Sequence, residues 1–184
     1  GMAQALNNLG EVARYRGDLA AAANSYQEAL GLFRQLATRA DVARTLHNNA
    51  ALALAKGDTV GAGSGFRESV ELFRAWGNCR GIVECIAGFA QLRLMLATDT
   101  TDWECVAPIL GFVAAYFTRM GAAMWPPDRK AFVRAIAVLA EHLNDDLHTA
   151  AWACGQNMTL EQALAMAYSC DTPEWRENKM IISP

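Results

Sequence analysis

Small and apolar residues recur along this chain with the spacing of an α-helix, and short polar breaks separate one run from the next. In the first run, Leu6 and Leu9 lie on one side of a predicted helix. Gly17-Asp18 then interrupts the pattern, because glycine can close a helix in the left-handed conformation and aspartate can cap the next one. A second helix is predicted from about residue 19 to residue 36.

The sequence matches itself when it is shifted by 40 residues, so this pair of helices is a repeat. The aligned positions are Leu6 with Leu46, Asn8 with Asn48, Gly17-Asp18 with Gly57-Asp58, Tyr26 with Phe66 and Phe33 with Phe73. A weaker third copy carries Ile86 and Phe89 in its first helix and breaks at residues 97–102. Its second helix is predicted over residues 103–120, with Pro108 in the first or second turn, where proline is tolerated.

The repeat resembles the tetratricopeptide (TPR) pattern. The matching positions are the small residues Gly10, Ala50, Ala22 and Ala62 and the aromatic residues Tyr26 and Phe66. The period of 40 is longer than the usual 34 of that pattern, and its closing proline is missing. The resemblance implies an all-α fold, a TPR-like right-handed superhelical stack of antiparallel helix pairs, with three pairs over residues 1–125.

A Pro-Pro break at residues 125–128 ends the repeats, and Asp128 is predicted to cap the helix that follows it. Thr159 and Gln162 have the spacing of a capping box, which opens a last helix. The helices predicted in this part of the chain cover residues 129–143, 146–154 and 160–168. The expected divisions after the repeats are a C-terminal helical cap over residues 126–170 and an irregular tail over residues 171–184.

The closing part of the chain carries a second, more specific resemblance. Its elements are Leu110-Gly111, Pro126-Pro127, the segment AAWACG at residues 150–155 and the segment MTLEQA at residues 158–163. This order is similar to the C-terminal end of bacterial LuxR-type transcriptional regulators and STAND-class signalling ATPases. The chain departs from that pattern in the apolar run 112–117, where those proteins carry acidic residues, and at Cys154, where a charged residue is usual.

The resemblance implies a non-catalytic protein–protein interaction or sensor-scaffold arm, distinct from the parts of those regulators that bind nucleotide and DNA. A free-standing TPR adaptor that binds a peptide or protein in its concave groove is the alternative. First helices line the groove in TPR proteins, and asparagine can hold a peptide backbone because it both donates and accepts hydrogen bonds. The side chains predicted to line the groove are Asn7, Asn8, Glu11, Arg14, Arg44, His47, Asn48 and Gln91.

Two further expectations follow from this interpretation. Asn48→Ala should leave thermal stability nearly unchanged, because a groove residue is exposed. The partner should be a protein or peptide, including other domains of the same parent protein. A homodimer stays open as an alternative, either through the N-terminal end of the stack or through the exposed part of an aromatic and methionine-rich surface at residues 103–125.

Composition narrows the function classes. The net charge is −3 and no block of Lys or Arg occurs, so we expect no direct nucleic-acid binding. The most apolar segment, residues 106–120, is too short to span a bilayer, so we expect no membrane association. Five cysteines without a C-x-x-C motif indicate reduced thiols in a cytoplasmic protein.

The sequence contains no convincing catalytic or cofactor motif. The glycine-rich run at residues 61–65 lacks the Lys and Ser/Thr of a phosphate-binding loop, and we interpret its glycines as residues that weaken a helix. His47, His142 and His148 have no metal-ligand spacing to one another or to cysteine, although an accidental metal site around residues 142–148 is an alternative. We therefore expect no enzyme activity, no cofactor and no metal; a small enzyme is the weakest of the three hypotheses.

Overall fold

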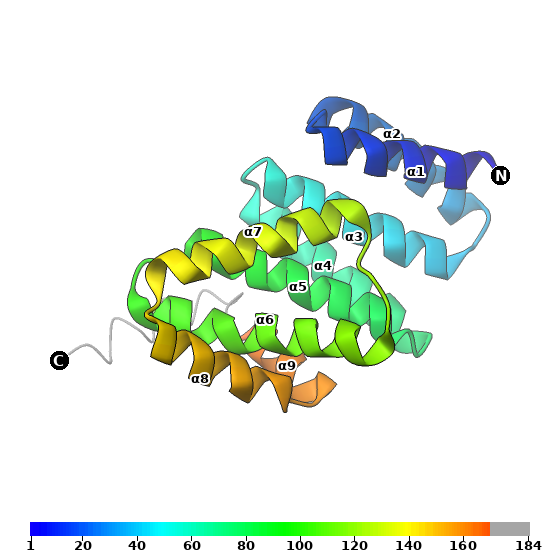
Figure 1. Cartoon of the computed structure of the whole chain (residues 1–184). Helices are drawn as coiled ribbons and strands as arrows, with labels where there is room; N and C mark the ends of the chain where they lie inside the picture. The colour runs from blue at the N-terminus through cyan, green and yellow to red at the C-terminus, as the bar shows by residue number, and fades with distance from the viewer. Residues whose placement is uncertain (170–184) are drawn as a thin grey trace.

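The computed structural model describes residues 1–169, and this part of the chain folds into nine α-helices without a strand (Figure 1). The helices are α1 (Met2–Arg16), α2 (Leu19–Gln35), α3 (Arg39–Ala55), α4 (Thr59–Ala75), α5 (Cys79–Leu96), α6 (Thr100–Met120), α7 (Pro126–His142), α8 (Asp145–Gln156) and α9 (Leu160–Tyr168). The predicted all-α stack of TPR-like helix pairs is confirmed. None of the described helices combines the length and the apolar character needed to cross a membrane.

Short turns of the same design join several helices, at residues 17–18, 57–58 and 77–78. The glycine that opens each turn has a positive φ, of 86°, 82° and 68° respectively. The Asp or Asn that follows accepts a hydrogen bond from the backbone N–H three residues further on, at 2.9, 2.8 and 3.0 Å. Local sequence therefore determines where these helices end and begin, as predicted for the first two turns.

Close approach of a large ring to a glycine sets the distance between packed helices. Tyr26 and Phe66 are fully buried. A Cβ atom added at Gly10 would lie 2.5 Å from the Tyr26 ring, and one added at Gly88 would overlap the Phe66 ring. The aromatic position of the repeat thus fills the gap between neighbouring layers, where only a glycine leaves room for it.

The glycine-rich run in α4 also has a packing role, which the sequence interpretation missed. A Cβ atom at Gly65 would lie 2.9 Å from the Cβ atom of Ala50, so glycine lets α4 approach α3. A Cβ atom at Gly61 would collide with the carboxylate of Asp58, which caps the helix. Gly61 and Gly65 therefore permit close approach, a role that stands beside the predicted weakening of the helix.

Helix α6 begins three residues earlier than predicted. Asp99 and Asp102 form a capping box: the Asp99 side chain accepts from the Asp102 N–H, and Asp102 accepts from the Asp99 N–H. Pro108 consequently lies in the third turn of the helix, so its predicted place in the first or second turn is wrong.

The hydrophobic core is unevenly divided. One large cluster draws buried residues from α3, α4, α5, α6, α7 and α9, and partly buried residues of α8 pack against it. The first helix pair contributes to two small clusters instead, one around Ala29 and Phe33 and the other around Ala22 and Tyr26. The apolar contacts that attach α1 and α2 to the rest of the chain are therefore few.

Helix α7 turns back over the stack, with which it packs through α1, α5 and α6. In Figure 1 it runs in front of α3 and α5. This path brings the start of α7 onto the inner face of the repeats. The division of the chain into pairs, cap and tail stays a prediction, and residues 170–184 lie outside the described part.

Candidate functional site

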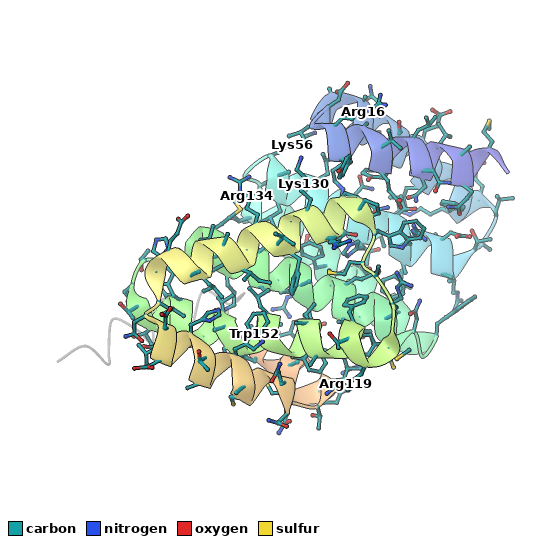
Figure 2. The ribbon with its side chains drawn as sticks, viewed as in Figure 1. Arg16, Lys56, Arg119, Lys130, Arg134 and Trp152 are labelled. Carbon is teal, nitrogen blue, oxygen red and sulfur yellow. The ribbon has the colours of Figure 1, made fainter. Side chains whose placement is uncertain are left out.

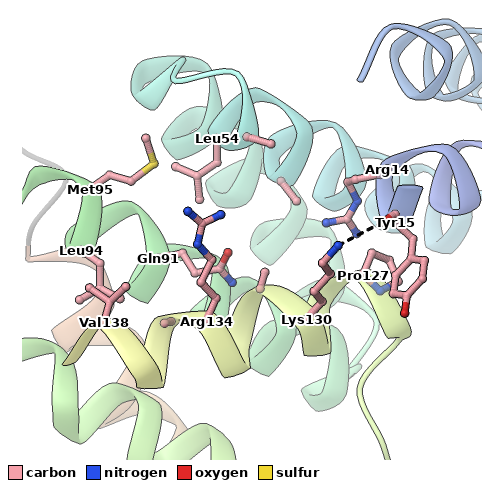
Figure 3. A pocket seen from close by; sticks show the side chains of 14 residues that line it. Arg14, Tyr15, Leu54, Gln91, Leu94, Met95, Pro127, Lys130, Arg134 and Val138 are labelled. Atoms are coloured by element: carbon pink, nitrogen blue, oxygen red, sulfur yellow. Dashed lines mark hydrogen bonds between the residues drawn. The ribbon is translucent and has the colours of Figure 1, made fainter. Parts of the chain in front are cut away.

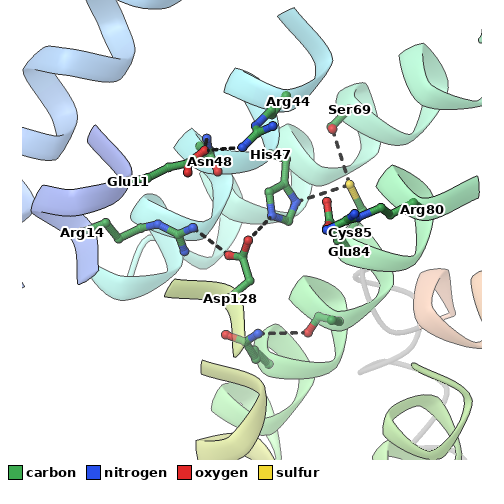
Figure 4. Close-up of polar contacts among 12 residues, drawn as sticks. Glu11, Arg14, Arg44, His47, Asn48, Ser69, Arg80, Glu84, Cys85 and Asp128 are labelled. Carbon is green, nitrogen blue, oxygen red and sulfur yellow. Dashed lines mark hydrogen bonds and ion pairs between the residues drawn. The ribbon is translucent and has the colours of Figure 1, made fainter. Parts of the chain in front are cut away.

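Six of the eight side chains predicted to line the groove come together in one polar cluster with Asp128 of α7 (Figure 4). We call this group the inner-face cluster; it consists of Asn7, Glu11, Arg14, Arg44, His47, Asn48 and Asp128. The other two predicted residues lie apart from it. Asn8 is exposed and accepts a hydrogen bond from the Gln4 amide, and Gln91 is half-buried on α5.

The prediction that these side chains line an open groove is wrong for most of the cluster. Asn7, His47 and Asn48 are only 1%, 4% and 2% exposed. The physical reason is that α1, α3 and α7 meet here, so that these polar groups lie against protein in place of solvent. Whether a partner binds anywhere along this face stays a prediction.

Hydrogen bonds among amide and carboxylate groups join α1 to α3. The Asn48 amide donates to Asn7 Oδ1 at 3.0 Å and to Glu11 Oε1 at 3.2 Å, and the Asn7 amide donates to the same Glu11 oxygen at 3.0 Å. Arg44 closes the group with an ion pair to Glu11 at 2.9 Å, while its guanidinium lies 4.3 Å from the ring centroid of Trp125. Asn7 and Asn48, which occupy neighbouring but not equivalent positions of the repeat, therefore pair with one another between α1 and α3.

Asp128 connects α7 to both first helices. Its Oδ1 accepts from Arg14 at 2.7 Å, and its Oδ2 lies 3.5 Å from His47 Nε2, an ion-pair contact that is long for a hydrogen bond. All three side chains are at most 10% exposed. A buried carboxylate between two cations is compensated in charge, which a lone buried aspartate would not be.

These contacts shift the protonation equilibria strongly. Burial alone would raise the pKa of Asp128, but Arg14 and His47 hold it well below its usual range. Burial alone would lower the pKa of His47, but Asp128 and the hydrogen bond with Cys85 raise it to about 10. At neutral pH the cluster therefore holds a carboxylate between a guanidinium and an imidazolium.

Asp128 was predicted to be a helix cap, and this is wrong. Helix α7 begins at Pro126, because proline fits the first turn of a helix, and its N-cap is Trp125. Asp128 then falls in the first turn with its side chain facing inward. A signal for this role was available in the sequence: the predicted groove held the cations Arg14 and Arg44 and a histidine against one glutamate, an excess that a carboxylate from elsewhere could balance.

The contacts of the cluster extend to Cys85, so that Asp128, His47 and Cys85 follow one another in a chain of side chains. Cys85 Sγ lies 3.6 Å from His47 Nδ1 and donates to Ser69 Oγ at 3.4 Å. The sulfur belongs to a residue with 0% exposure, so a substrate cannot reach it. In the part of the chain that is described, this arrangement therefore serves as a buried link between helices and lacks the access that nucleophilic catalysis needs.

No group of three or more His, Cys, Asp or Glu side chains with the geometry of a metal site occurs among residues 1–169. His142 stacks on Trp103 with 4.0 Å between ring centroids, and its Nδ1 lies 2.8 Å from the Val138 carbonyl oxygen. His148 packs beside the Trp152 ring, at 5.5 Å. Both histidines of the alternative metal site thus have aromatic neighbours.

A cavity of about 520 Å³ lies next to the inner-face cluster, between α3, α5 and α7 (Figure 3). Leu54, Leu94 and Val138 form part of its apolar wall, and Lys130 and Arg134 stand on its α7 side. Gln91 is the one predicted groove residue outside the cluster that lines it. The inner face is therefore closed at the start of α7 and hollow further along it.

The aromatic and methionine-rich surface predicted over residues 103–125 is largely core. Phe112, Phe117 and Met124 are buried. Met120 and Trp125 keep 61% and 42% of their surface exposed, and Trp125 is partly covered by Arg44.

Comparison with known families finds one match. The tetratricopeptide repeat family model matches residues 1–75, which span α1 to α4. No curated protein and no solved structure matches the chain. The first two helix pairs are thus tetratricopeptide-like in sequence as well as in structure, and proteins with such repeats generally mediate protein–protein interactions.

Proposed function

We propose that this chain is a non-catalytic protein-interaction and scaffold module whose partner packs on the outer face of α1. The observation that supports this is an apolar stripe left uncovered. Met2, Leu9 and Val12 follow one another at helical spacing and are 65%, 59% and 49% exposed. Apolar side chains gathered on one helix face mark an interaction surface more often than scattered ones do.

The repeat itself shows what kind of surface covers such a face. Val12 is equivalent to Leu52 at the offset of 40, and Leu52 is only 4% exposed. Leu52 is buried because the first helix pair, through Ala22 and Tyr26, packs against it. The outer face of α1 therefore has the form of a surface that receives another pair of helices.

We propose further that the module is the C-terminal part of a LuxR-type or STAND-class transcriptional regulator, in which the covering helices belong to the same polypeptide. The support is the resemblance of the closing segments. Their glycines have a physical role: a Cβ atom at Gly111 would lie 2.5 Å from the Trp152 carbonyl oxygen, and one at Gly155 would clash with the Pro108 carbonyl oxygen. The pattern thus describes how α8 packs onto α6, which is a feature that related chains would share.

The proposed location is the cytoplasm, without direct contact to nucleic acid or membrane. The four described cysteines, Cys79, Cys85, Cys105 and Cys154, are free, which suits a reducing compartment.

Two measurements test the proposal. An immunoblot of the native host lysate, with an antibody to this domain, should show a band far above 20.0 kDa if the regulator context holds. A band near 20.0 kDa supports the alternative, a free-standing adaptor.

The interaction surface is tested by affinity capture from that lysate with the wild-type chain, a Leu9→Ser/Val12→Ser variant and a Val133→Ser control. Val133 is 57% exposed but lies on α7, away from the stripe. If the covering helices belong to a separate protein, the same binding protein should be captured by the wild type and the control and lost with the double variant. Equal capture by all three would show that the outer face of α1 is not the interaction surface.

A further inference from the structure

The cavity between α3, α5 and α7 combines an apolar wall with positive charge. Its apolar lining consists of Ala51, Leu54, Ala55, Leu94, Met95, Pro127, Ala131, Ala135 and Val138. Its charged lining consists of Arg14, Lys130 and Arg134, and none of the lining side chains, all of which lie in the described part of the chain, is acidic. A volume of about 520 Å³ lies within the range of small-molecule sites.

The three cations differ in their partners. Arg14 is neutralised by Asp128 at 2.7 Å. Lys130 Nζ donates a hydrogen bond to the Tyr15 carbonyl oxygen at 3.4 Å and lies 5.3 Å from the centroid of the Tyr15 ring. Lys130 therefore contacts the C-terminal end of α1. Arg134 is exposed and makes no ion pair with any described residue. In Figure 3 its guanidinium extends from α7 toward Leu54, across the cavity.

Further positive charge surrounds the same region. Arg16 at the end of α1 and Lys56 after the end of α3 gather with Lys130 and Arg134 on one side of the molecule (Figure 2). The chain as a whole carries a net charge of −3, so this local excess of cations runs against its overall balance. Such a rim attracts an anion toward the opening of the cavity.

We propose that this cavity binds a small amphipathic carboxylate, with its carboxylate at Arg134 and Lys130 and its hydrocarbon body between α3, α5 and α7. Arginine presents paired N–H donors that match a carboxylate, and the lining of Leu54, Leu94 and Val138 offers apolar contact for the chain behind it. A free fatty acid and another carboxylate with a short hydrocarbon chain share this chemistry.

The geometry favours a small molecule over an extended peptide. A peptide that followed the inner face would have to pass the first turn of α7, where Asp128 is bound to Arg14 and His47. Those ion pairs close the groove at that end. The inference goes beyond the proposed function and does not depend on it, because the cavity lies on the side of α7 and the proposed partner surface lies on the outer face of α1.

The test uses the whole chain labelled with ¹³C at its methionine methyl groups, titrated with octanoate below its micelle concentration. Met95 lines the cavity, whereas Met2 and Met120 are exposed elsewhere. The Met95 methyl signal, assigned with Met95→Leu, should shift in a saturable manner while those of Met2 and Met120 stay in place. Octan-1-ol, which lacks the charge, should bind about tenfold more weakly.

Matched variants on α7 separate the site from general effects of charge. Arg134→Ala should weaken octanoate binding about tenfold, because it removes the charge-assisted hydrogen bonds to the carboxylate. Arg129→Ala removes an exposed arginine of the same helix that does not line the cavity, so it should leave binding unchanged. Ala131→Phe should abolish binding by filling the space.

Several results would overturn the inference. They are an unchanged Met95 signal up to the micelle concentration, equal affinity in Arg134→Ala and wild type, equal binding of octan-1-ol and octanoate, or parallel shifts of all exposed methionines. Arg134→Ala changes a surface residue and keeps the fold, so the test stands even if Ala131→Phe fails to fold.

Discussion

The first helix pair, α1 and α2, and the late pair of contacting helices, α6 and α8, are both joined to the middle of the molecule, but by different means. The first pair shares small apolar clusters with α3 and adds buried polar contacts from Asn7, Glu11 and Arg14. Helix α6 belongs to the large core and α8 packs against it, and the two helices touch backbone to backbone at two glycines. Polar contacts require a specific geometry and contribute modestly to the free energy of unfolding. Closely packed helices leave no space for an added atom, so an added atom destabilises the fold.

The largest effect should come from the residue that ties the first pair to α7. Asp128→Ala leaves the Arg14 guanidinium buried without its counter-charge and removes the carboxylate that raises the pKa of His47. Removal of one partner from a buried ion pair costs about 3–5 kcal/mol of unfolding free energy. Urea denaturation would measure this loss, and hydrogen exchange should show that α1 and α2 lose protection before α5 and α6 do.

Glu141→Ala serves as the control for that change, because Glu141 is an exposed acid at the other end of α7. It should alter the free energy of unfolding by less than about 0.5 kcal/mol. If Asp128→Ala were as mild as Glu141→Ala, the ion pairs of Asp128 would not contribute to holding the first pair against α7.

Gly155→Ala should have the next largest effect, in the other region. Its Cβ atom would clash with the carbonyl oxygen of Pro108, a backbone atom that cannot turn aside. We expect a loss of about 3 kcal/mol, the upper part of the range for overpacking, together with early exchange of the amides of α8. Gly31→Ala is the matched control: nothing lies within 4 Å of its added Cβ atom, so it should stabilise α2 by about 0.5–1 kcal/mol.

Asn48→Ala should have an intermediate effect on the free energy of unfolding and tests the polar contacts between α1 and α3. The expectation of unchanged thermal stability assumed an exposed residue, but Asn48 is 2% exposed and donates to Asn7 and Glu11. Loss of its amide leaves two buried acceptors with fewer donors, so the free energy of unfolding should fall by about 2 kcal/mol. Asn8→Ala, at the equivalent position of the exposed first helix, should change it by less than about 0.5 kcal/mol, and similar losses in both variants would contradict the buried network.

Features set by neighbours in the chain could be predicted from the sequence. The turns at residues 17–18 and 57–58 and the capping box from Thr159 all depend on residues within about four positions of one another. Each of them was placed correctly, because a helix end is decided by local hydrogen bonds.

Features set by distant contacts could not be predicted in the same way. Periodicity identified the inner face of α1 and α3 but could not tell that α7 would cover it, since Arg14 and Asp128 are 114 residues apart. The groove was therefore assumed to be open, and Asn7, His47 and Asn48 were assigned to solvent. Gly111 and Gly155 were noticed as parts of a pattern, while their reason, contact with the backbone of a facing helix, required the structure.

The most gradual effect we expect is a pH dependence carried by His47, because it is spread over several pH units. Burial disfavours its charge, but Asp128 raises its pKa in the folded chain to about 10, above the ordinary value of 6.5. A raised folded-state pKa stabilises the fold fully below pH 6.5, and this stabilisation is lost as the pH rises through about 10. In that window the free energy of unfolding should fall by at most about 1.4 kcal/mol for each pH unit.

Comparison with His47→Gln isolates this contribution, since other titrating groups are common to both chains. The pKa of Asp128 is lowered in the folded chain, so the stabilisation by its carboxylate is lost only in acid, below the ordinary pKa of 3.8. Burial raises the pKa of Glu84, which gives a slope of the same sign, beginning above its ordinary 4.5. Urea midpoints between about pH 7 and 9.5 should therefore fall more steeply in the wild type than in His47→Gln. Parallel curves would mean that His47 is neutral in the folded chain, and that Arg14 alone holds Asp128 and with it the start of α7 against the first helix pair.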